Sequence, residues 1–86
     1  MMNKTLFIVD DNNHICKIIA CQFRRDFNCL CYDDVESAVA AINSGLKPSV
    51  IISETPLQAP EQIPVIVYAK PFDPEDIVFE VNQKLQ

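Results

Sequence analysis

The sequence predicts a small α/β domain built on a parallel sheet. Short, wholly apolar runs alternate along the chain with segments of helical period, and the first of these runs stops at a pair of aspartates. Strands buried on both faces have this continuous apolar character, and alternation of strands with helices implies helices on both faces of the sheet. A chain of 86 residues has room for one domain with one modest core.

The first strand and helix lie within the first third of the chain. Residues 6–9 (LFIV) form an apolar run that stops at Asp10-Asp11. An amphipathic helix is predicted over residues 13–26, capped by Asp11 or Asn12. Its apolar stripe has three- and four-residue spacings and comprises Ile15, Ile18, Ile19, Phe23 and Phe27.

A second strand and helix follow. Residues 28–32 (NCLCY) are short and apolar, and Asp33-Asp34-Val35-Glu36 resembles a capping box that opens a helix. One face of that helix would carry Val35, Ala38, Val39 and Ile42. The single glycine of the chain, Gly45, stands where a helix C-cap is expected.

The last third of the chain supplies two strands and one helix. Residues 50–53 and 64–68 are the apolar runs, separated by a proline-containing stretch without helical period. This link is short for a parallel crossover, which normally includes a helix. Asp73-Pro74-Glu75-Asp76 is a strong helix start, and the following apolar face comprises Ile77, Val78, Val81 and Leu85.

Composition excludes several functional classes. The net charge is −5 and the seven Lys and Arg are scattered, which disfavours nucleic-acid binding. No apolar run approaches the length of a membrane span, and the acids at Asp10-Asp11 come too early for a signal-peptide core, so we expect a cytoplasmic protein. The spacings of the four cysteines predict reduced, mostly buried thiols, with metal or redox roles as the alternative.

Charged side chains follow the ends of three of the apolar runs. Asp10-Asp11 follow the first, Glu54 the third and Lys70 the fourth. Functional residues of an open α/β sheet gather at the carboxyl ends of its strands, so these groups should meet at one edge. We expect Lys70 to bond Glu54 or the acid pair, and clustered carboxylates with phosphate are a setting that suits Mg²⁺.

Four segments of the sequence resemble the receiver domain of two-component response regulators. They are "LFIVDDN", "PSVIISETPL", "IPVIVYA" and "AKPFDPEDI", and together they span nearly the whole chain. The resemblance implies a truncated flavodoxin-like (CheY-like) three-layer sandwich of about four parallel strands, in the order 2-1-3-4, and three helices. Residues 1–86 would be a single degenerate receiver domain, without the family's third and fourth helices and one of its strands.

The resemblance also assigns roles to individual positions. Asp10 and Asp11 match the acid pair that binds Mg²⁺ in the family, and Lys70-Pro71 match its Lys-Pro element. The backbone carbonyl that helps to bind the metal would belong to Pro56.

Two positions depart from the family pattern. Glu54 holds the place of the aspartate that accepts the phosphoryl group, and Ala69 holds the place of the switch Ser or Thr. Glu54 is therefore either a permanently charged mimic of phosphoaspartate or a surface acid paired with Lys70, and a true phosphoacceptor role is disfavoured. Asp10 and Asp11 would provide a weak Mg²⁺ site or only the anions that favour the N-terminus of the first helix.

The missing elements should leave an apolar flank of the sheet exposed around Val65 and Val67. An uncovered apolar edge invites pairing with another chain, so we expect self-association, for example as a homodimer by strand pairing or domain swapping.

The leading hypothesis is a non-catalytic pseudo-receiver. It would act in two-component, phosphorelay-type signal transduction through protein contacts, independently of its own phosphorylation and without a required cofactor. Its partner would be a histidine kinase, another response regulator or a second copy. The alternatives are a Mg²⁺-dependent phosphoacceptor receiver and a dimerisation element with a vestigial acid site.

Overall fold

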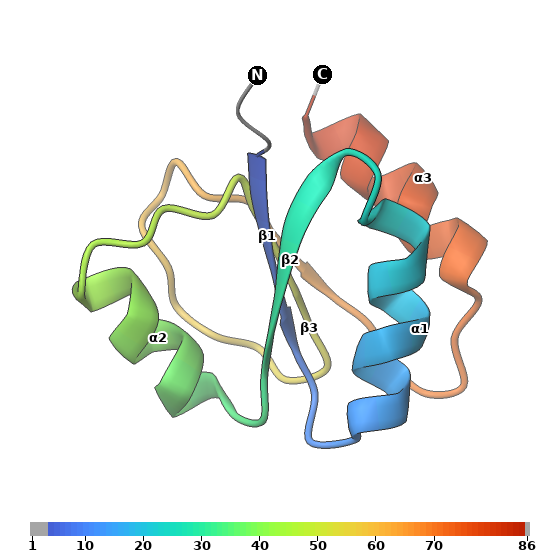
Figure 1. The fold of residues 1–86 in the computed structure, drawn as a ribbon, viewed down its shortest axis with the longest axis horizontal. Coiled ribbons are helices and arrows are strands. Elements are labelled where there is room, and N and C mark those ends of the chain that lie inside the picture. The colour runs from blue at the N-terminus through green and yellow to red at the C-terminus, as the bar shows by residue number, and fades with distance from the viewer. Residues whose placement is uncertain (1–3, 86) are drawn as a thin grey trace.

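The computed structural model describes residues 4–85. Its elements, in chain order, are β1 (Lys4–Val9), α1 (Asn13–Phe23), β2 (Phe27–Tyr32), α2 (Val35–Asn43), β3 (Val50–Ser53), β4 (Val65–Val67) and α3 (Pro74–Lys84) (Figure 1). All strand pairings are parallel, and the strands lie in the order β2-β1-β3-β4. The predicted flavodoxin-like α/β layout, with four strands ordered 2-1-3-4 and three helices, is confirmed.

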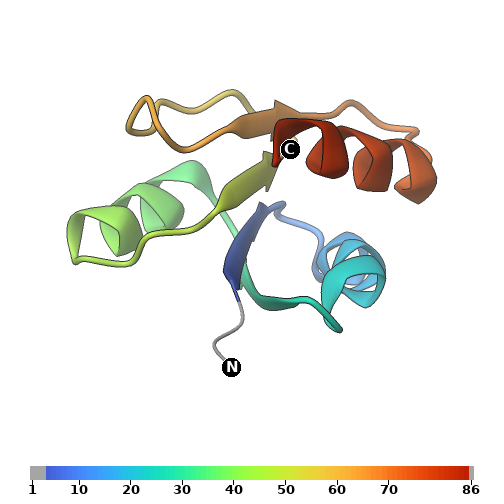
Figure 2. The ribbon, with the colours of Figure 1, turned by 90° about the horizontal axis from the view of Figure 1, so that it is seen from above.

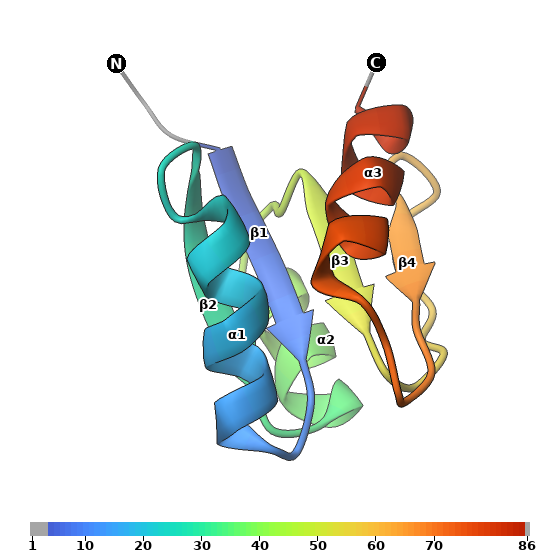
Figure 3. The same cartoon turned by 90° about the vertical axis from the view of Figure 1, so that its right-hand side faces the viewer.

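The helices divide unequally between the two faces of the sheet. Helices α1 and α3 lie side by side on one face, with α1 over β1 and β2 and α3 over β3 and β4, whereas α2 lies on the other face (Figures 2 and 3). The core beneath α1 and α3 is the larger one and includes Leu6, Ile8, Ile52, Ile19, Phe23, Ile77 and Val81. A smaller core on the α2 side contains Phe7, Val9, Ala38 and Ile51.

The register of the central strands aligns their carboxyl ends, where the charged residues follow. Val9 of β1 lies opposite Ser53 of β3, and Ser53 lies opposite Val67 of β4. The ladder continues one step further, because the Glu54 N–H donates to the Val9 carbonyl at 3.2 Å and the Tyr68 N–H donates to the Ser53 carbonyl at 3.0 Å. Asp10, Glu54 and Tyr68 are thus brought to the same edge by backbone pairing.

Side-chain caps fix where each helix begins. Asn12 accepts from the His14 N–H at 2.9 Å, Asp34 from the Ser37 N–H at 2.8 Å and Asp73 from the Glu75 N–H at 2.9 Å. Each acceptor satisfies a donor that the first helical turn leaves without a partner. The sequence predicted a cap at or next to each of these residues.

Helix α2 ends in a Schellman motif at Gly45. The Gly45 N–H donates to the Ile42 carbonyl and the Leu46 N–H to the Ala41 carbonyl, at 3.0 and 3.2 Å. Gly45 has a φ of +116°, a conformation in which a side chain would be strained. The predicted C-cap signal at the chain's one glycine is confirmed.

The first helix is shorter than predicted. It ends at Phe23 rather than residue 26, and Phe27 belongs to β2, where it pairs with Lys4. Phe27 follows Phe23 by four residues, a spacing that resembles a continuation of the helical stripe. In the structure the two rings pack edge-on, at a centroid separation of 5.9 Å. Ile18, placed on the stripe from its spacing, is 44% exposed.

Residues 55–64 cover part of the α2 side of the sheet without forming a helix. Leu57, Ala59 and Ile63 from this segment pack against the smaller core, together with the half-buried Val65. Figure 2 shows the segment on the same side of the sheet as α2. The predicted apolar flank is therefore smaller than expected: Val65 is partly covered, and Val67 is 48% exposed.

All four cysteines are free thiols. Cys16 is buried and Cys29 half-buried, but Cys21 and Cys31 are exposed, so the prediction of mostly buried thiols is wrong for these two. Cys31 lies on β2, which pairs with one other strand of the described sheet, β1. Among residues 4–85, no helix has both the length and the apolar character needed to cross a membrane.

Candidate functional site: an acid pocket at the carboxyl edge of the sheet

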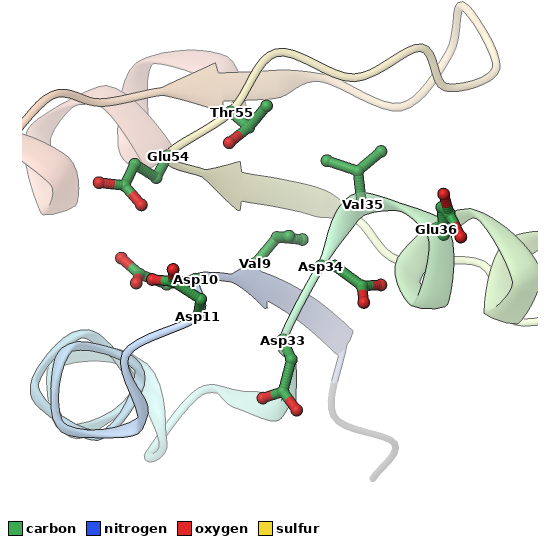
Figure 4. Close-up of a pocket in the computed structure, with 9 residues that line it drawn as sticks. All are labelled: Val9, Asp10, Asp11, Asp33, Asp34, Val35, Glu36, Glu54 and Thr55. Carbon is green, nitrogen blue, oxygen red and sulfur yellow. The ribbon is translucent and has the colours of Figure 1, made fainter.

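An open, acid-lined pocket of about 490 Å³ lies at the carboxyl ends of β1, β2 and β3 (Figure 4). Its lining residues are Val9, Asp10, Asp11, Asp33, Asp34, Val35, Glu36, Glu54 and Thr55. Glu54 and the Asp10-Asp11 pair reach toward the same side of the pocket, whereas Asp33, Asp34 and Glu36 point elsewhere (Figure 4). The predicted convergence of Asp10, Asp11 and Glu54 is present in the structure.

Asp10 is the buried centre of this site. Its side chain is 0% exposed, and both carboxylate oxygens accept hydrogen bonds. Oδ1 accepts from the Asn12 N–H at 2.8 Å and from Lys70 Nζ at 3.1 Å. Oδ2 accepts from the hydroxyl of the buried Tyr68. A buried charge is tolerable when it is paired and hydrogen-bonded in this way.

Lys70 bridges the two strand ends. Its ammonium nitrogen lies 3.1 Å from Asp10 Oδ1 and 3.3 Å from Glu54 Oε2. The side chains of Lys70 and Glu54 are 34% and 33% exposed, so the outer half of the bridge faces solvent while the inner half is buried. The bond predicted between Lys70 and either the acid pair or Glu54 is formed with both.

The hydrogen bonds of the network shift its pKa values in consistent directions. Burial opposes ionisation of Asp10, but the bonds from Tyr68, the Asn12 N–H and Lys70 outweigh it and lower the pKa of this carboxyl. Burial and the bond to the Asp10 carboxylate raise the pKa of the Tyr68 hydroxyl well above its ordinary value. The hydrogen bond to Asp10, supported by Glu54, raises the pKa of Lys70. The site therefore holds an ionised acid, a neutral phenol and a charged lysine.

The turn after Glu54 is fixed by the buried Ser53. The Ser53 hydroxyl donates to the Thr55 carbonyl and accepts from the Thr55 N–H at 3.1 Å. These bonds satisfy the only buried hydroxyl at the end of β3 within the described chain, and they set the direction in which the chain leaves the strand. Glu54 is consequently held between an ordered strand and an ordered turn.

The other predicted site residues lie around this network. Asp11 is exposed at the pocket mouth, and oxygens of Asp10, Asp11 and Glu54 lie within 4.8 Å of one another. Ala69 is exposed, next to Lys70, and brings no hydroxyl to the site. Pro71 is exposed and lines a separate shallow apolar groove with Ile15, Ile18, Phe72 and Pro74, beside Lys70.

Tyr68 is the site residue that sequence reasoning missed. The sequence pattern places it at the end of an apolar strand and gives no role to its hydroxyl. A signal was present, because Tyr68 shares the inward face of its strand with Ile66, and a buried tyrosine hydroxyl normally needs a polar partner.

The roles that the receiver resemblance assigns to these residues stay predictions. No protein-family model matches the chain, and neither a characterised protein nor a solved structure matches it either.

Proposed function

We propose that this chain is a pseudo-receiver, a signalling module that acts through protein contacts and needs no phosphorylation of its own. The observation that carries the proposal is the Lys70 bridge, at 3.1 Å from Asp10 and 3.3 Å from Glu54. The Glu54 carboxylate supplies a constant negative charge at the position where a receiver places its phosphoacceptor. Lys70 engages that charge in the unmodified chain.

The neighbouring positions support a site that presents charge rather than transfers a phosphoryl group. Ala69 has no hydroxyl to follow a phosphoryl oxygen, and the inner bonds of Lys70 and Tyr68 fix Asp10 in place. The pocket is strongly acidic, so an incoming phosphate anion is repelled unless a cation accompanies it.

The surface beside the Lys70 bridge offers a binding site for a protein partner that also contacts Glu54. The shallow groove formed by Ile15, Ile18, Pro71, Phe72 and Pro74 is apolar and adjoins Lys70. Apolar side chains of a partner can fill this groove while its polar groups meet Glu54. The partner class that the motifs favour is a histidine kinase or another response regulator.

Phosphorylation is tested by incubating the protein with Mg²⁺ and either acetyl phosphate or beryllofluoride. We expect an unchanged intact mass and amide NMR shifts no larger than those caused by Mg²⁺ alone. An acid-labile phosphoryl adduct, or saturable beryllofluoride shifts centred on Glu54, would instead identify a working phosphoacceptor.

Partner recognition is tested against a panel of histidine kinases and receiver domains from the source organism. We expect at least one of them to bind, and Glu54→Gln to weaken that binding about tenfold, the size of effect typical for a polar residue near an interface centre. Glu36→Gln is the matched control, since Glu36 lines the same pocket without contacting Lys70. Equal binding by both variants would make the acid site vestigial, and absence of any binder would overturn the contact function.

A dimerisation element is the second candidate, and the free edge of β4 favours it. Val67 is 48% exposed on this edge strand, and no described residue pairs with its outer side. Sedimentation of the protein at several concentrations tests this candidate.

A further inference from the structure

We infer that Tyr68 and Lys70 close the acid pocket to divalent cations, so that the site operates with an internal ammonium group in place of a metal ion. The receiver resemblance implies Mg²⁺ at Asp10 and Asp11, but the donors around Asp10 do not fit that ion. Closure of the pocket to metal ions does not depend on whether a protein partner contacts Glu54.

The carboxylate of Asp10 has little hydrogen-bonding capacity left for an ion. A carboxylate offers about four lone-pair positions. Three of them are taken, by the Asn12 N–H, by Lys70 Nζ and by the Tyr68 hydroxyl, and the side chain is 0% exposed. An ion that coordinates Asp10 must therefore displace one of these donors, because no solvent-facing position remains.

The ammonium group of Lys70 already occupies the place of a bridging cation. It contacts oxygens of Asp10 and Glu54 at 3.1 and 3.3 Å, and both acids belong to the trio whose oxygens converge within 4.8 Å. A dication placed among these oxygens would meet the positive charge of Lys70 at close range. Lys70 must swing away before the metal can use either acid fully.

Tyr68 is held in a fixed position. Its N–H donates to the Ser53 carbonyl at 3.0 Å, and its ring packs against Phe72 at a centroid separation of 5.0 Å. The residue is only 8% exposed. Lys70 can move into solvent, whereas Tyr68 cannot withdraw its hydroxyl without disturbing the core. Tyr68 is thus the positioning residue that keeps Asp10 unavailable.

What remains for a metal is a poor site. Asp11 and Glu54 are the members of the trio with solvent-facing oxygens, and Glu54 is shared with Lys70. Mg²⁺ demands near-octahedral geometry and gives up its water reluctantly, so two carboxylates on an open surface hold it weakly.

The inference is tested by titrating Mg²⁺, and Mn²⁺ as its paramagnetic substitute, into ¹⁵N-labelled protein. We expect no saturable shifts at millimolar Mg²⁺ and no selective broadening of the Asp10 to Asn12 amides by Mn²⁺ in the wild type. The double variant Tyr68→Phe/Lys70→Met removes both donors but keeps the ring and the aliphatic stem. It should bind Mg²⁺ at least about tenfold more tightly than the wild type.

Each outcome decides the matter. Saturable Mg²⁺ binding at Asp10 by the wild type would overturn the inference without any variant, and would leave the proposed function standing if acetyl phosphate still had no effect. A folded double variant with no gain in binding would also overturn it. Should the double variant not fold, Tyr68→Phe and Lys70→Met alone provide the comparison. Adding Asp10→Asn to the tightest-binding variant should abolish the gain, and a retained gain would place the ion elsewhere and contradict the inference.

Discussion

Asp10 combines full burial with a formal charge, and this sets the energetics of the site. Its carboxylate has hydrogen-bond donors on both oxygens, one of them the cationic Lys70. Such a network is stable when every member is satisfied and costly when one is removed. Asp11, by contrast, is exposed at the pocket mouth. The two adjacent acids, Asp10 and Asp11, should therefore contribute very differently to the stability of the fold.

We predict that Asp10→Asn lowers the free energy of unfolding by about 1–3 kcal/mol, because the amide nitrogen turns one acceptor into a donor facing another donor in a buried site. Urea denaturation measures the change. Asp11→Asn is the matched control and should change stability by less than about 0.5 kcal/mol, as for most surface substitutions. Equal effects of the two variants would contradict the burial argument.

The pKa directions predict a loss of stability at both ends of the pH range. The lowered pKa of Asp10 stabilises the fold above the unfolded value, near 3.9, and this contribution is lost as the pH falls through the lower folded value. The raised pKa values of Tyr68 and Lys70 stabilise the fold below about pH 10, and their contributions are lost as the pH rises through the folded values.

Tyr68→Phe separates the alkaline contributions. Without the hydroxyl, the part of the stability loss above about pH 10 that comes from ionisation of Tyr68 disappears, whereas the part from Lys70 persists, as does the part from Tyr32, whose pKa is raised by burial. Urea midpoints from neutral pH to pH 11 should therefore fall less steeply in the variant than in the wild type. Parallel curves would show that the Tyr68 bond to Asp10 does not persist in solution.

The charged residues of the site could be predicted from the sequence, but the role of Tyr68 could not. The charges at Asp10, Glu54 and Lys70 were predictable because they end apolar strands whose carboxyl ends must meet. The role of Tyr68 was not predictable from its own pattern, since an aromatic residue suits a buried strand without any polar function. Its bond to Asp10 depends on the register of three strands, which the sequence does not state.

The segment 55–64 is the least conventional connection between elements of the fold. It joins parallel neighbours β3 and β4 without a helix, yet Leu57, Ala59 and Ile63 still cover the smaller core. The sequence indicated the absence of a helix through its prolines and lack of period. It did not indicate that scattered apolar side chains would replace the covering helix, because irregular segments have no period from which a buried face can be read. The observed α1 is shorter than the predicted helix because Phe27 fits the helical spacing in the sequence but pairs with β1 as part of β2.

We predict that Leu57→Ser lowers the free energy of unfolding by about 1–2 kcal/mol, through exposure of a half-buried side chain and of the core beneath it. Gln58→Ser, at an exposed neighbouring position, is the control and should have little effect. Urea denaturation measures both, and binding of a hydrophobic dye reports the exposed core. A neutral Leu57→Ser would mean that this segment does not cover the sheet.

In the molecule as a whole, β4 is one of the two edge strands of the described sheet, and its outer side can pair with a second copy. Ile51 N–H donates to the Pro64 carbonyl, and Tyr68 N–H to the Ser53 carbonyl, so residues 64, 66 and 68 direct their backbone groups toward β3. Val65 and Val67 then direct theirs outward. These outward groups are self-complementary across a two-fold axis, which makes a second copy of the chain the natural occupant.

We predict self-association through this edge, measured by sedimentation at several protein concentrations. Val67→Lys places a charge on the edge and should shift the protein toward monomer with little loss of stability, because Val67 is already 48% exposed. Phe79→Lys is the control: Phe79 is 63% exposed but belongs to α3, so it contributes no backbone group to the strand edge. A monomeric wild type, or dissociation by Phe79→Lys alone, would refute the edge model.

The bond between Asp10 and Tyr68 joins residues that are 58 positions apart. During synthesis the amino-terminal part of a chain emerges first, so β1 and Asp10 are available long before the hydroxyl that completes their pairing. A nascent or cleaved chain that stops short of Tyr68 has an acid at the end of its central strand with neither the phenol nor Lys70 to receive it, and burying that acid would be costly. The same bond that fixes the charge at the pocket thus makes assembly of the sheet conditional on arrival of its last strand.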